Sequence, residues 1–113
     1  MKVALCLVVL LAVANQDRRA LLLNPDAREF REPAPAVSVV RFDTSRGVIE
    51  IEVTRAWAPR GADRFITLVR HGYYDGARFF RIRRAQWVQF GINGDPAIAE
   101  AWPRTPVVVL TAT

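Results

Sequence analysis

Several side chains that commonly carry chemistry are scarce in this chain. Its 113 residues include one cysteine, one histidine and one methionine, and Lys2 is the one lysine. A single thiol, Cys6, cannot form an intrachain disulfide, and His71 has no second histidine with which to share a metal ion. The sequence also lacks a glycine-rich phosphate loop, a Ser/His/Asp set and a paired-carboxylate site. We therefore expect no metal, no disulfide and no nucleotide cofactor.

The chain also lacks a hydrophobic run of the length that an ordinary transmembrane helix needs, about 20 residues. Its apolar stretch covers residues 3–13, preceded by Lys2 and followed by Ala14, with small residues two positions apart at its end. This layout is typical of a secretory signal peptide over residues 1–14. It predicts export to the periplasm or the medium, with no stable membrane span after cleavage. An uncleaved anchor, a buried core segment and a misassigned start codon are the alternatives.

Acidic residues are outnumbered: 16 basic against 11 acidic side chains give a formal net charge of +5. Hydrophobic residues make up 51% of the chain and charged residues 24%, which indicates one modest globular domain rather than disorder. The arginines are scattered and mostly have acidic neighbours, as in Asp17-Arg18 and Arg28-Glu29. Such spacing is typical of a solvated surface, so we expect no nucleic-acid partner. Arg83-Arg84 is a short basic run.

Residues 15–36 have the composition of a linker between the export signal and a folded domain. A proline at position 25 would stop any helix entering from the signal, and Pro33-Ala34-Pro35-Ala36 favours extended backbone. We therefore predict that the domain proper occupies residues 37–113.

The first half of this domain predicts a β-hairpin and a helix. Residues 37–43 and 48–53 are β-rich, and the second run alternates apolar and acidic side chains around a turn that contains Gly47. A helix is expected to begin at Pro59, which suits a first helical turn, and to end before Gly72. The fold class is therefore mainly β with a capping helix.

The second half is organised around two aromatic and β-branched runs, residues 79–82 and 86–90, which predict paired strands. Arg81 lies inside the first run. An arginine in an apolar strand is costly unless its guanidinium reaches the surface, is paired or binds something in a cleft. Further on, residues 107–111 predict a lone apolar strand.

Four motifs then follow one another in order: Arg41 to Gly47, Ala58 to Phe65, Leu68 to Gly76, and Phe79 to Gly91. Together, over residues 37–102, they resemble the cyclophilin-type peptidyl-prolyl cis-trans isomerases, most closely the bacterial, often exported, branch. The resemblance implies a closed antiparallel β-barrel capped by helices, and proline-containing polypeptides as clients.

The same resemblance implies the roles of particular side chains. It makes Arg81 the catalytic residue, whose guanidinium donates to the prolyl nitrogen as the X–Pro bond twists. It makes Phe80, Gln86, Trp87 and Gln89 the substrate-binding residues. No metal or other cofactor is implied.

The sequence departs from the family pattern around these residues. Arg84, Ala85 and Gln86 stand where the family usually has Pro-Gly-Phe, and Gln86 is a poor apolar wall for a proline ring. Trp87 stands where a methionine or valine is usual; it either fills part of that gap or belongs to the core. Phe80 replaces the usual histidine, a change typical of the exported branch.

The chain is also expected to supply about half of the barrel, as a truncated domain over residues 37–113. Half a barrel leaves an unpaired strand edge and an incomplete core, which predicts marginal stability or dependence on a partner. Two alternatives to an isomerase therefore stay open. One is a non-catalytic module that binds proline peptides, and the other is an inactive fragment that lacks the second half of the pocket.

Overall fold

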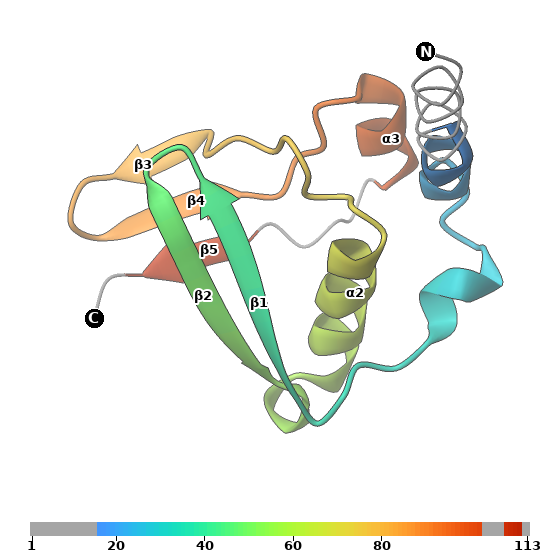
Figure 1. Cartoon of the computed structure of the whole chain (residues 1–113), viewed down its shortest axis with the longest axis horizontal. Helices are drawn as coiled ribbons and strands as arrows, with labels where there is room; N and C mark the ends of the chain where they lie inside the picture. The colour runs from blue at the N-terminus through green and yellow to red at the C-terminus, as the bar shows by residue number, and fades with distance from the viewer. Residues whose placement is uncertain (1–15, 103–107, 112–113) are drawn as a thin grey trace, which may run out of the picture.

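The computed structural model describes residues 16–102 and 108–111, so the predicted signal peptide lies outside the described residues (Figure 1). A helix covers residues 16–22 at the start of this part. The elements that follow, in chain order, are η1 (Arg28–Arg31), β1 (Val37–Thr44), β2 (Gly47–Thr54), η2 (Arg55–Trp57), α2 (Pro59–Arg70), β3 (Arg81–Arg83), β4 (Trp87–Phe90), α3 (Pro96–Ala101) and β5 (Val108–Thr111). Within the described ranges, no helix is long and apolar enough to cross a membrane.

The predicted hairpin is confirmed. Strands β1 and β2 pair antiparallel, with Val37 opposite Thr54 and Thr44 opposite Gly47 at the turn. Gly47 has a φ of 127°, which L side chains rarely adopt, so the glycine is required there. The acidic side chains of β2 are exposed while its isoleucines are half-buried, which confirms the expected alternation.

Helix α2 begins and ends where the sequence predicts. Pro59 is its first residue, and Gly72 follows its last turn with a φ of 72°. The N–H of Tyr73 donates to the Leu68 carbonyl at 3.0 Å and that of Gly72 to the Val69 carbonyl at 3.1 Å. This pair of bonds is a Schellman motif, which satisfies carbonyls that the helix end would leave unpaired.

The second sheet corrects one prediction. Its strand order is β3-β4-β5, so the C-terminal strand expected to stand alone pairs with β4. The register places Val88 opposite Leu110 and Phe90 opposite Val108. An isolated apolar strand would leave its backbone donors and acceptors unpaired, and pairing with β4 removes that cost along one edge.

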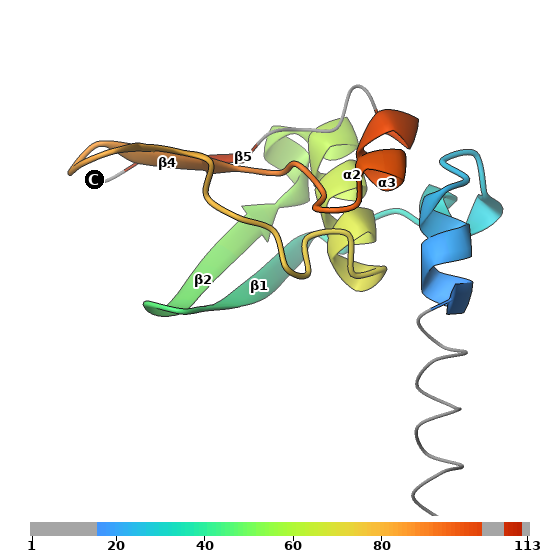
Figure 2. The same ribbon diagram turned by 90° about the horizontal axis from the view of Figure 1, so that it is seen from above.

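The two sheets do not close into a barrel. They share no backbone ladder and lie at an angle to each other, with α2 beside the hairpin (Figures 1 and 2). Phe42 of β1 connects the two sheets, since the centroid of its ring lies 5.3 Å from that of Phe90 in β4. The same ring also lies 6.3 Å, between centroids, from that of Phe65 in α2. The architecture is an incomplete cyclophilin-like antiparallel fold, as the sequence predicted.

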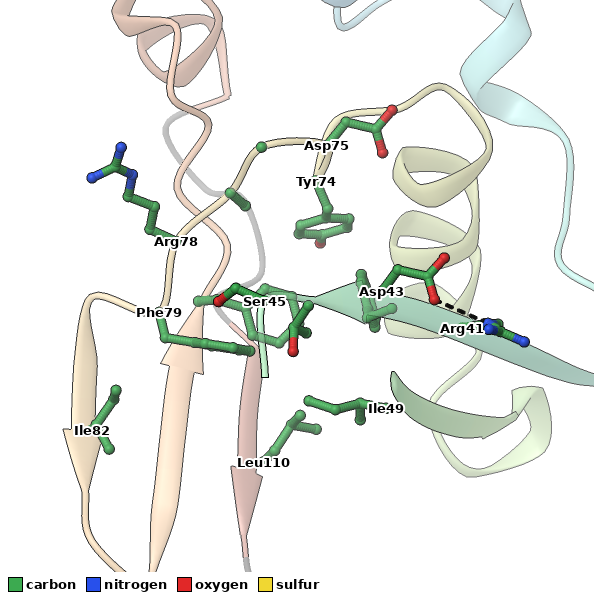
Figure 3. A pocket seen from close by; sticks show the side chains of 15 residues that line it. Arg41, Asp43, Ser45, Ile49, Tyr74, Asp75, Arg78, Phe79, Ile82 and Leu110 are labelled. Atoms are coloured by element: carbon green, nitrogen blue, oxygen red, sulfur yellow. Dashed lines mark hydrogen bonds and ion pairs between the residues drawn. The ribbon is translucent and has the colours of Figure 1, made fainter. Parts of the chain in front are cut away.

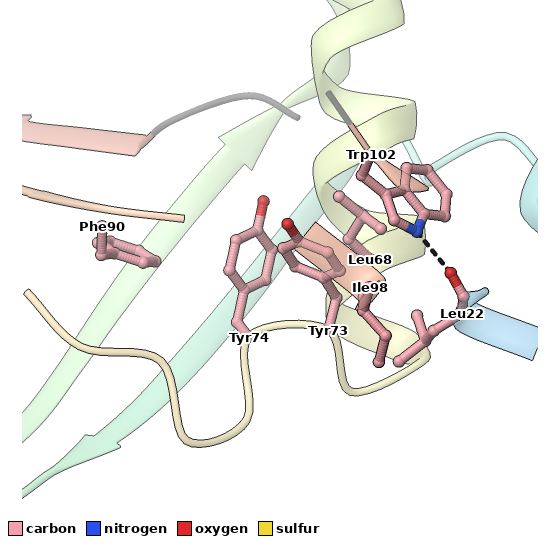
Figure 4. Close-up of a cluster of buried hydrophobic side chains, with 7 residues drawn as sticks. All are labelled: Leu22, Leu68, Tyr73, Tyr74, Phe90, Ile98 and Trp102. Atoms are coloured by element: carbon pink, nitrogen blue, oxygen red, sulfur yellow. Dashed lines mark hydrogen bonds between the residues drawn. The ribbon is translucent and has the colours of Figure 1, made fainter. Parts of the chain in front are cut away.

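The main core extends from the helical end of the molecule to Phe90 of β4, where side chains of both sheets pack against it. Its buried members come from six segments, and Leu68 and Tyr73 are the most deeply enclosed (Figure 4). The indole N–H of Trp102 donates to the Leu22 carbonyl at 2.7 Å. That bond satisfies a polar atom inside an apolar cluster and ties residues 80 positions apart.

The same contact changes the interpretation of residues 15–36. From the described position 16 onward, this predicted linker packs against the domain, because Leu22 and Ala34 are both buried. The Phe30 ring lies 5.1 Å from the Trp102 ring in an edge-to-face arrangement. The sequence did not predict that this segment packs against the domain, because its apolar residues are few and lack a clear period.

An ion pair fastens the hairpin end to α2. The Arg55 guanidinium donates to both carboxylate oxygens of Asp63, at 2.8 and 3.0 Å, and the Ala34 N–H donates to Asp63 Oδ1 at 2.8 Å. The hydrogen bonds from Arg55, and then that from Ala34, lower the pKa of Asp63 to about 2. Asp63 lies in the first half of α2, and its principal partners are these two donors.

Replacing Trp102 should separate the two contributions of its side chain. Trp102→Ala removes a buried indole and should lower the free energy of unfolding by about 3–5 kcal/mol. Trp102→Phe keeps a ring but leaves the Leu22 carbonyl unpaired, at a cost of about 1–3 kcal/mol. Urea unfolding of the two variants measures both changes in the free energy of unfolding.

Trp57→Ala is the matched control, because Trp57 is 86% exposed and its loss should change stability little. Equal effects at the two positions would contradict this assignment of the core.

The Asp63 pair predicts a defined pH dependence of stability. A carboxyl whose folded-state pKa is lowered stabilises the fold above its unfolded pKa, about 4. That stabilisation should disappear as the pH falls from about 4 toward the folded-state pKa of about 2. Asp63→Asn should therefore unfold at a lower temperature than the parent chain at pH 6. The difference in unfolding temperature between the variant and the parent chain should become smaller when thermal unfolding is measured at successively lower pH. A difference that does not depend on pH would refute the role of the Arg55–Asp63 pair.

Candidate functional site

The β3–β4 hairpin brings together the two side chains that the sequence singled out. Arg81 and Gln89 are directly opposite each other in the antiparallel register. The N–H of Phe80, the residue before β3, also donates to the Gln89 carbonyl, at 3.1 Å. Opposite residues in such a pair project from the same face of the sheet, with Cβ atoms about 5 Å apart. The guanidinium of Arg81 and the amide of Gln89 can therefore contact one bound group.

Trp87 belongs to the same face. It lies two residues before Gln89 and diagonal to Arg81, whose guanidinium carbon is 5.0 Å from the centroid of the indole ring. This is a cation–π contact, which holds a long flexible arginine against a rigid plane. Trp87 is half-buried, so its ring supports Arg81 instead of filling the interior.

Phe80 and Gln86 are placed differently from these three residues. Phe80 precedes β3, and its side chain is 47% exposed. Gln86 is exposed in the turn between the strands, where its N–H donates to the Arg83 carbonyl at 3.0 Å. Ala85, with a φ of 59°, completes this turn. The structure thus groups Arg81, Trp87 and Gln89, and leaves Phe80 and Gln86 at the margin.

Strand alternation also places Arg83, half of the short basic run Arg83-Arg84, at the candidate site. Arg83 is directly opposite Trp87, so it lies on the same face as Arg81. The signal was present in the sequence, since Arg83 is two positions from Arg81 within one strand. It was missed because the predicted strand stopped at residue 82.

The environment of Arg81 explains how an arginine is accommodated within an apolar strand. Arg81 is exposed, and its apolar neighbour Ile82 projects from the other face of the sheet. Among the described residues, no carboxylate lies within ion-pair distance of Arg81. A guanidinium in this setting stays charged and offers its N–H donors to a ligand.

A cavity of about 870 Å³ lies on the opposite face of the same sheet (Figure 3). Its lining includes Phe42 and Ile49 from the hairpin, and Ile82, Phe90 and Leu110 from the second sheet. Arg81, Trp87 and Gln89 do not line it. The space between the sheets is therefore separate from the candidate site, and corresponds to the interior of the unclosed barrel.

Tyr74 is the buried polar group at this cavity. Its hydroxyl has no hydrogen-bond partner among the described residues, although the side chain is 6% exposed. Burial raises the pKa of Tyr74, so the phenol stays neutral near neutral pH. It is consequently no candidate base. The residues described by the structure also contain no group of three histidine, cysteine or acidic side chains that could hold a metal ion.

Comparison with known proteins gives a consistent result. The family model for "Cyclophilin type peptidyl-prolyl cis-trans isomerase/CLD" matches residues 39–105. The chain is 42% identical over 57 residues to peptidyl-prolyl cis-trans isomerase CYP65 of Arabidopsis thaliana, covering 50% of this chain and 9% of that protein. It is 40% identical over 57 residues to peptidyl-prolyl cis-trans isomerase-like 1 of Mus musculus, covering 50% and 32%.

A bacterial relative shows similar coverage. The chain is 38% identical over 55 residues to peptidyl-prolyl cis-trans isomerase cyp18 of Streptomyces antibioticus, covering 49% of this chain and 33% of that protein. The chain thus spans about a third or less of the length of the curated relatives it matches. No solved structure matches it.

The contact between Arg81 and Trp87 predicts an energetic coupling. A double-mutant cycle with Arg81→Ala and Trp87→Ala should show a coupling of about 0.5–1 kcal/mol in the free energy of unfolding. Arg60→Ala paired with Trp87→Ala is the control, because exposed Arg60 lies in the first turn of α2 and belongs to a different element. The control pair should be additive. Additive behaviour of the first pair as well would show that the indole does not hold Arg81.

Proposed function

This chain belongs to the cyclophilin-type peptidyl-prolyl cis-trans isomerase family, and on that premise we propose that it assists protein folding by catalysing rotation about X–Pro bonds. The observation that carries the proposal is the placement of Arg81 directly opposite Gln89 on an exposed sheet face. The substrates are proline-containing segments of polypeptides. The names of the relatives in plant, mouse and bacterium support the same activity.

The physical task is to weaken amide resonance. Rotation about a peptide bond is opposed by a barrier of about 18–20 kcal/mol, and X–Pro isomerisation takes tens to hundreds of seconds unaided. As the bond twists, the prolyl nitrogen loses its share of the double bond and becomes a hydrogen-bond acceptor. A donor that meets this nitrogen in the twisted state stabilises the transition state more than the planar ground state.

Arg81 is suited to be that donor. Its guanidinium is charged at every physiological pH and carries several N–H groups in one plane, so it can hold a substrate carbonyl and the prolyl nitrogen together. The face of Trp87 restricts the arginine to one region of the sheet surface. Restricting the donor before the substrate arrives reduces the reorganisation needed in the transition state.

Gln89 supplies a second polar group on the same face. Its amide can donate to the carbonyl that precedes the proline, or accept from Arg81 and orient it. Either role fixes one side of the peptide while the other side rotates. No proton transfer, covalent intermediate or metal ion enters this sequence of events.

A second candidate function is a module that binds proline peptides without accelerating isomerisation. It is favoured by the positions of Gln86, which lies in an exposed turn, and of Phe80, which is 47% exposed. Neither encloses a proline ring against Arg81. A weakly enclosed ring could be bound while its bond is left untwisted.

We also propose that the chain is exported. The support is the N-terminal pattern of Lys2, an apolar run over residues 3–13 and Ala14. The helix over residues 16–22 follows the predicted cleavage position, so the buried contacts of Leu22 are compatible with removal of residues 1–14.

Arg81→Ala should reduce the rate of X–Pro isomerisation by about a hundredfold, the usual effect of removing one preorganised donor. Arg81→Lys should recover little, since an ammonium cannot contact two acceptors in one plane. Exchange spectroscopy of an Ala-Ala-Pro-Phe peptide, which needs no coupled protease, measures the rate. Arg60→Ala controls for loss of one positive charge. Undiminished acceleration by Arg81→Ala would refute the assigned role, and peptide binding without acceleration by the parent chain would favour the binding module.

A further inference from the structure

The β3–β4 hairpin carries the least compensated positive charge in the described part of the chain. No acidic residue occurs between Asp75 and Asp95, whereas this interval holds four arginines, at positions 78, 81, 83 and 84. Six arginines outside this interval, within the described part of the chain, contact a carboxylate, as in the contact of Arg19 with Asp95 at 2.8 Å. Among the described residues, none of the four hairpin arginines lies within ion-pair distance of a carboxylate.

The geometry places part of this charge beside the candidate site. Arg83 and Arg81 project from the same face, two residues apart along β3, which separates their Cα atoms by about 6.5 Å. Trp87 lies directly opposite Arg83 in the register and contacts the Arg81 guanidinium, so both arginines neighbour the same indole-bearing residue. Arg84 follows in the exposed turn.

The spacing of these arginines matches that of an extended peptide. Successive side chains on one edge of an extended segment repeat every two residues, at the same interval of about 6.5 Å. A segment whose proline lies at Arg81 would bring a side chain one or two residues away to Arg83 or Arg84. A carboxylate there would meet an uncompensated guanidinium, with which it can form a bidentate pair.

Resting on the proposed function, we propose that Arg83 and Arg84 make this site selective for proline segments with an aspartate or glutamate one or two residues from the proline. The acidic side chain binds beside Trp87 while the X–Pro bond lies at Arg81. The same arginines disfavour clients with lysine or arginine at those positions, because like charges in contact repel.

An acidic polypeptide fits this surface better than a nucleic acid does. A phosphate backbone needs a basic stripe that extends over several nucleotides. Here the charge is confined to one short segment, and Arg41 of β1 is paired with Asp43 at 3.1 Å. One face of Trp87 is also occupied by Arg81, which leaves less of the ring for stacking on a base.

The test compares three Ala-X-Pro-Phe peptides in which X is glutamate, alanine or lysine, with the full chain as receptor. Titration calorimetry measures Kd, and exchange spectroscopy measures isomerisation of the same peptides. The glutamate peptide should bind about two- to fivefold more tightly than the alanine peptide, and the lysine peptide more weakly, as expected for exposed ion pairs. The glutamate advantage should shrink as salt is raised.

Arg83→Ser combined with Arg84→Ser should abolish the glutamate advantage. Arg46→Ser combined with Arg60→Ser removes the same charge from other elements, and should leave the ratio of the two affinities unchanged. Loss of the advantage in both double variants would show an effect of net charge, and would overturn the inference.

Four other results test the inference, and the first two of them separate it from the proposed function. Equal Kd for the glutamate and alanine peptides, with both isomerised, overturns the inference and leaves the proposed function intact. A glutamate preference without acceleration of any peptide refutes catalysis and retains the acidic preference as a property of a binding module. If an Ala-Glu-Ala-Phe peptide binds with the same Kd as the glutamate-proline peptide, the inference is overturned, because recognition would then not involve proline. If a single-stranded RNA oligonucleotide binds more tightly than the glutamate-proline peptide, the inference is overturned as well.

Discussion

The register between β3 and β4 is the constraint on which the candidate site depends. Arg81 faces Gln89 because the turn that contains Ala85 has a fixed length and a residue at positive φ. A slip by one residue would send the Arg81 side chain and its same-face neighbours to the opposite side of the sheet. The apolar alternation resists such a slip, since Ile82 and Phe90 would then leave the cavity side for water. Core packing and site geometry are thus fixed by the same hydrogen-bond ladder.

The sheet β3-β4-β5 therefore separates two environments. One face supplies Phe90 and Leu110 to an apolar space shared with the β1–β2 hairpin. The other presents Arg81 and its neighbours to solvent, where a guanidinium keeps its charge without a buried partner. An arginine inside an apolar strand is costly when both faces of the sheet are covered. Here one face is open, and that cost does not arise.

Because the sheets are not closed into a barrel, the helical end of the molecule contributes more of the stability. Aromatic side chains there contact one another edge to face, and the Trp102 indole is hydrogen-bonded to Leu22. Arg55 and Asp63 fasten the base of the hairpin to α2. The space between the sheets contributes less, because part of it is a cavity whose lining has fewer contacts than a filled core.

Local patterns in the sequence were enough to predict the elements whose conformation depends on residues close together along the chain. The hairpin turn at Gly47, the first helical turn at Pro59 and the Schellman end at Gly72 each follow from the backbone preferences of one or two residues. The resemblance over residues 37–102 identified the family and singled out Arg81 and Gln89. It could not show that Gln86 would lie exposed in the turn between the strands.

Contacts between distant residues were decided by the tertiary structure. The pairing of β5 with β4, the burial of Leu22 against Trp102 and the bidentate contact of Arg55 with Asp63 join segments that no local period connects. The gathering of Arg83, Trp87 and Arg81 on one exposed face has the same origin. A sequence records which side chains are available, whereas the strand register and the open sheet face decide which of them meet, because both are set by packing between segments.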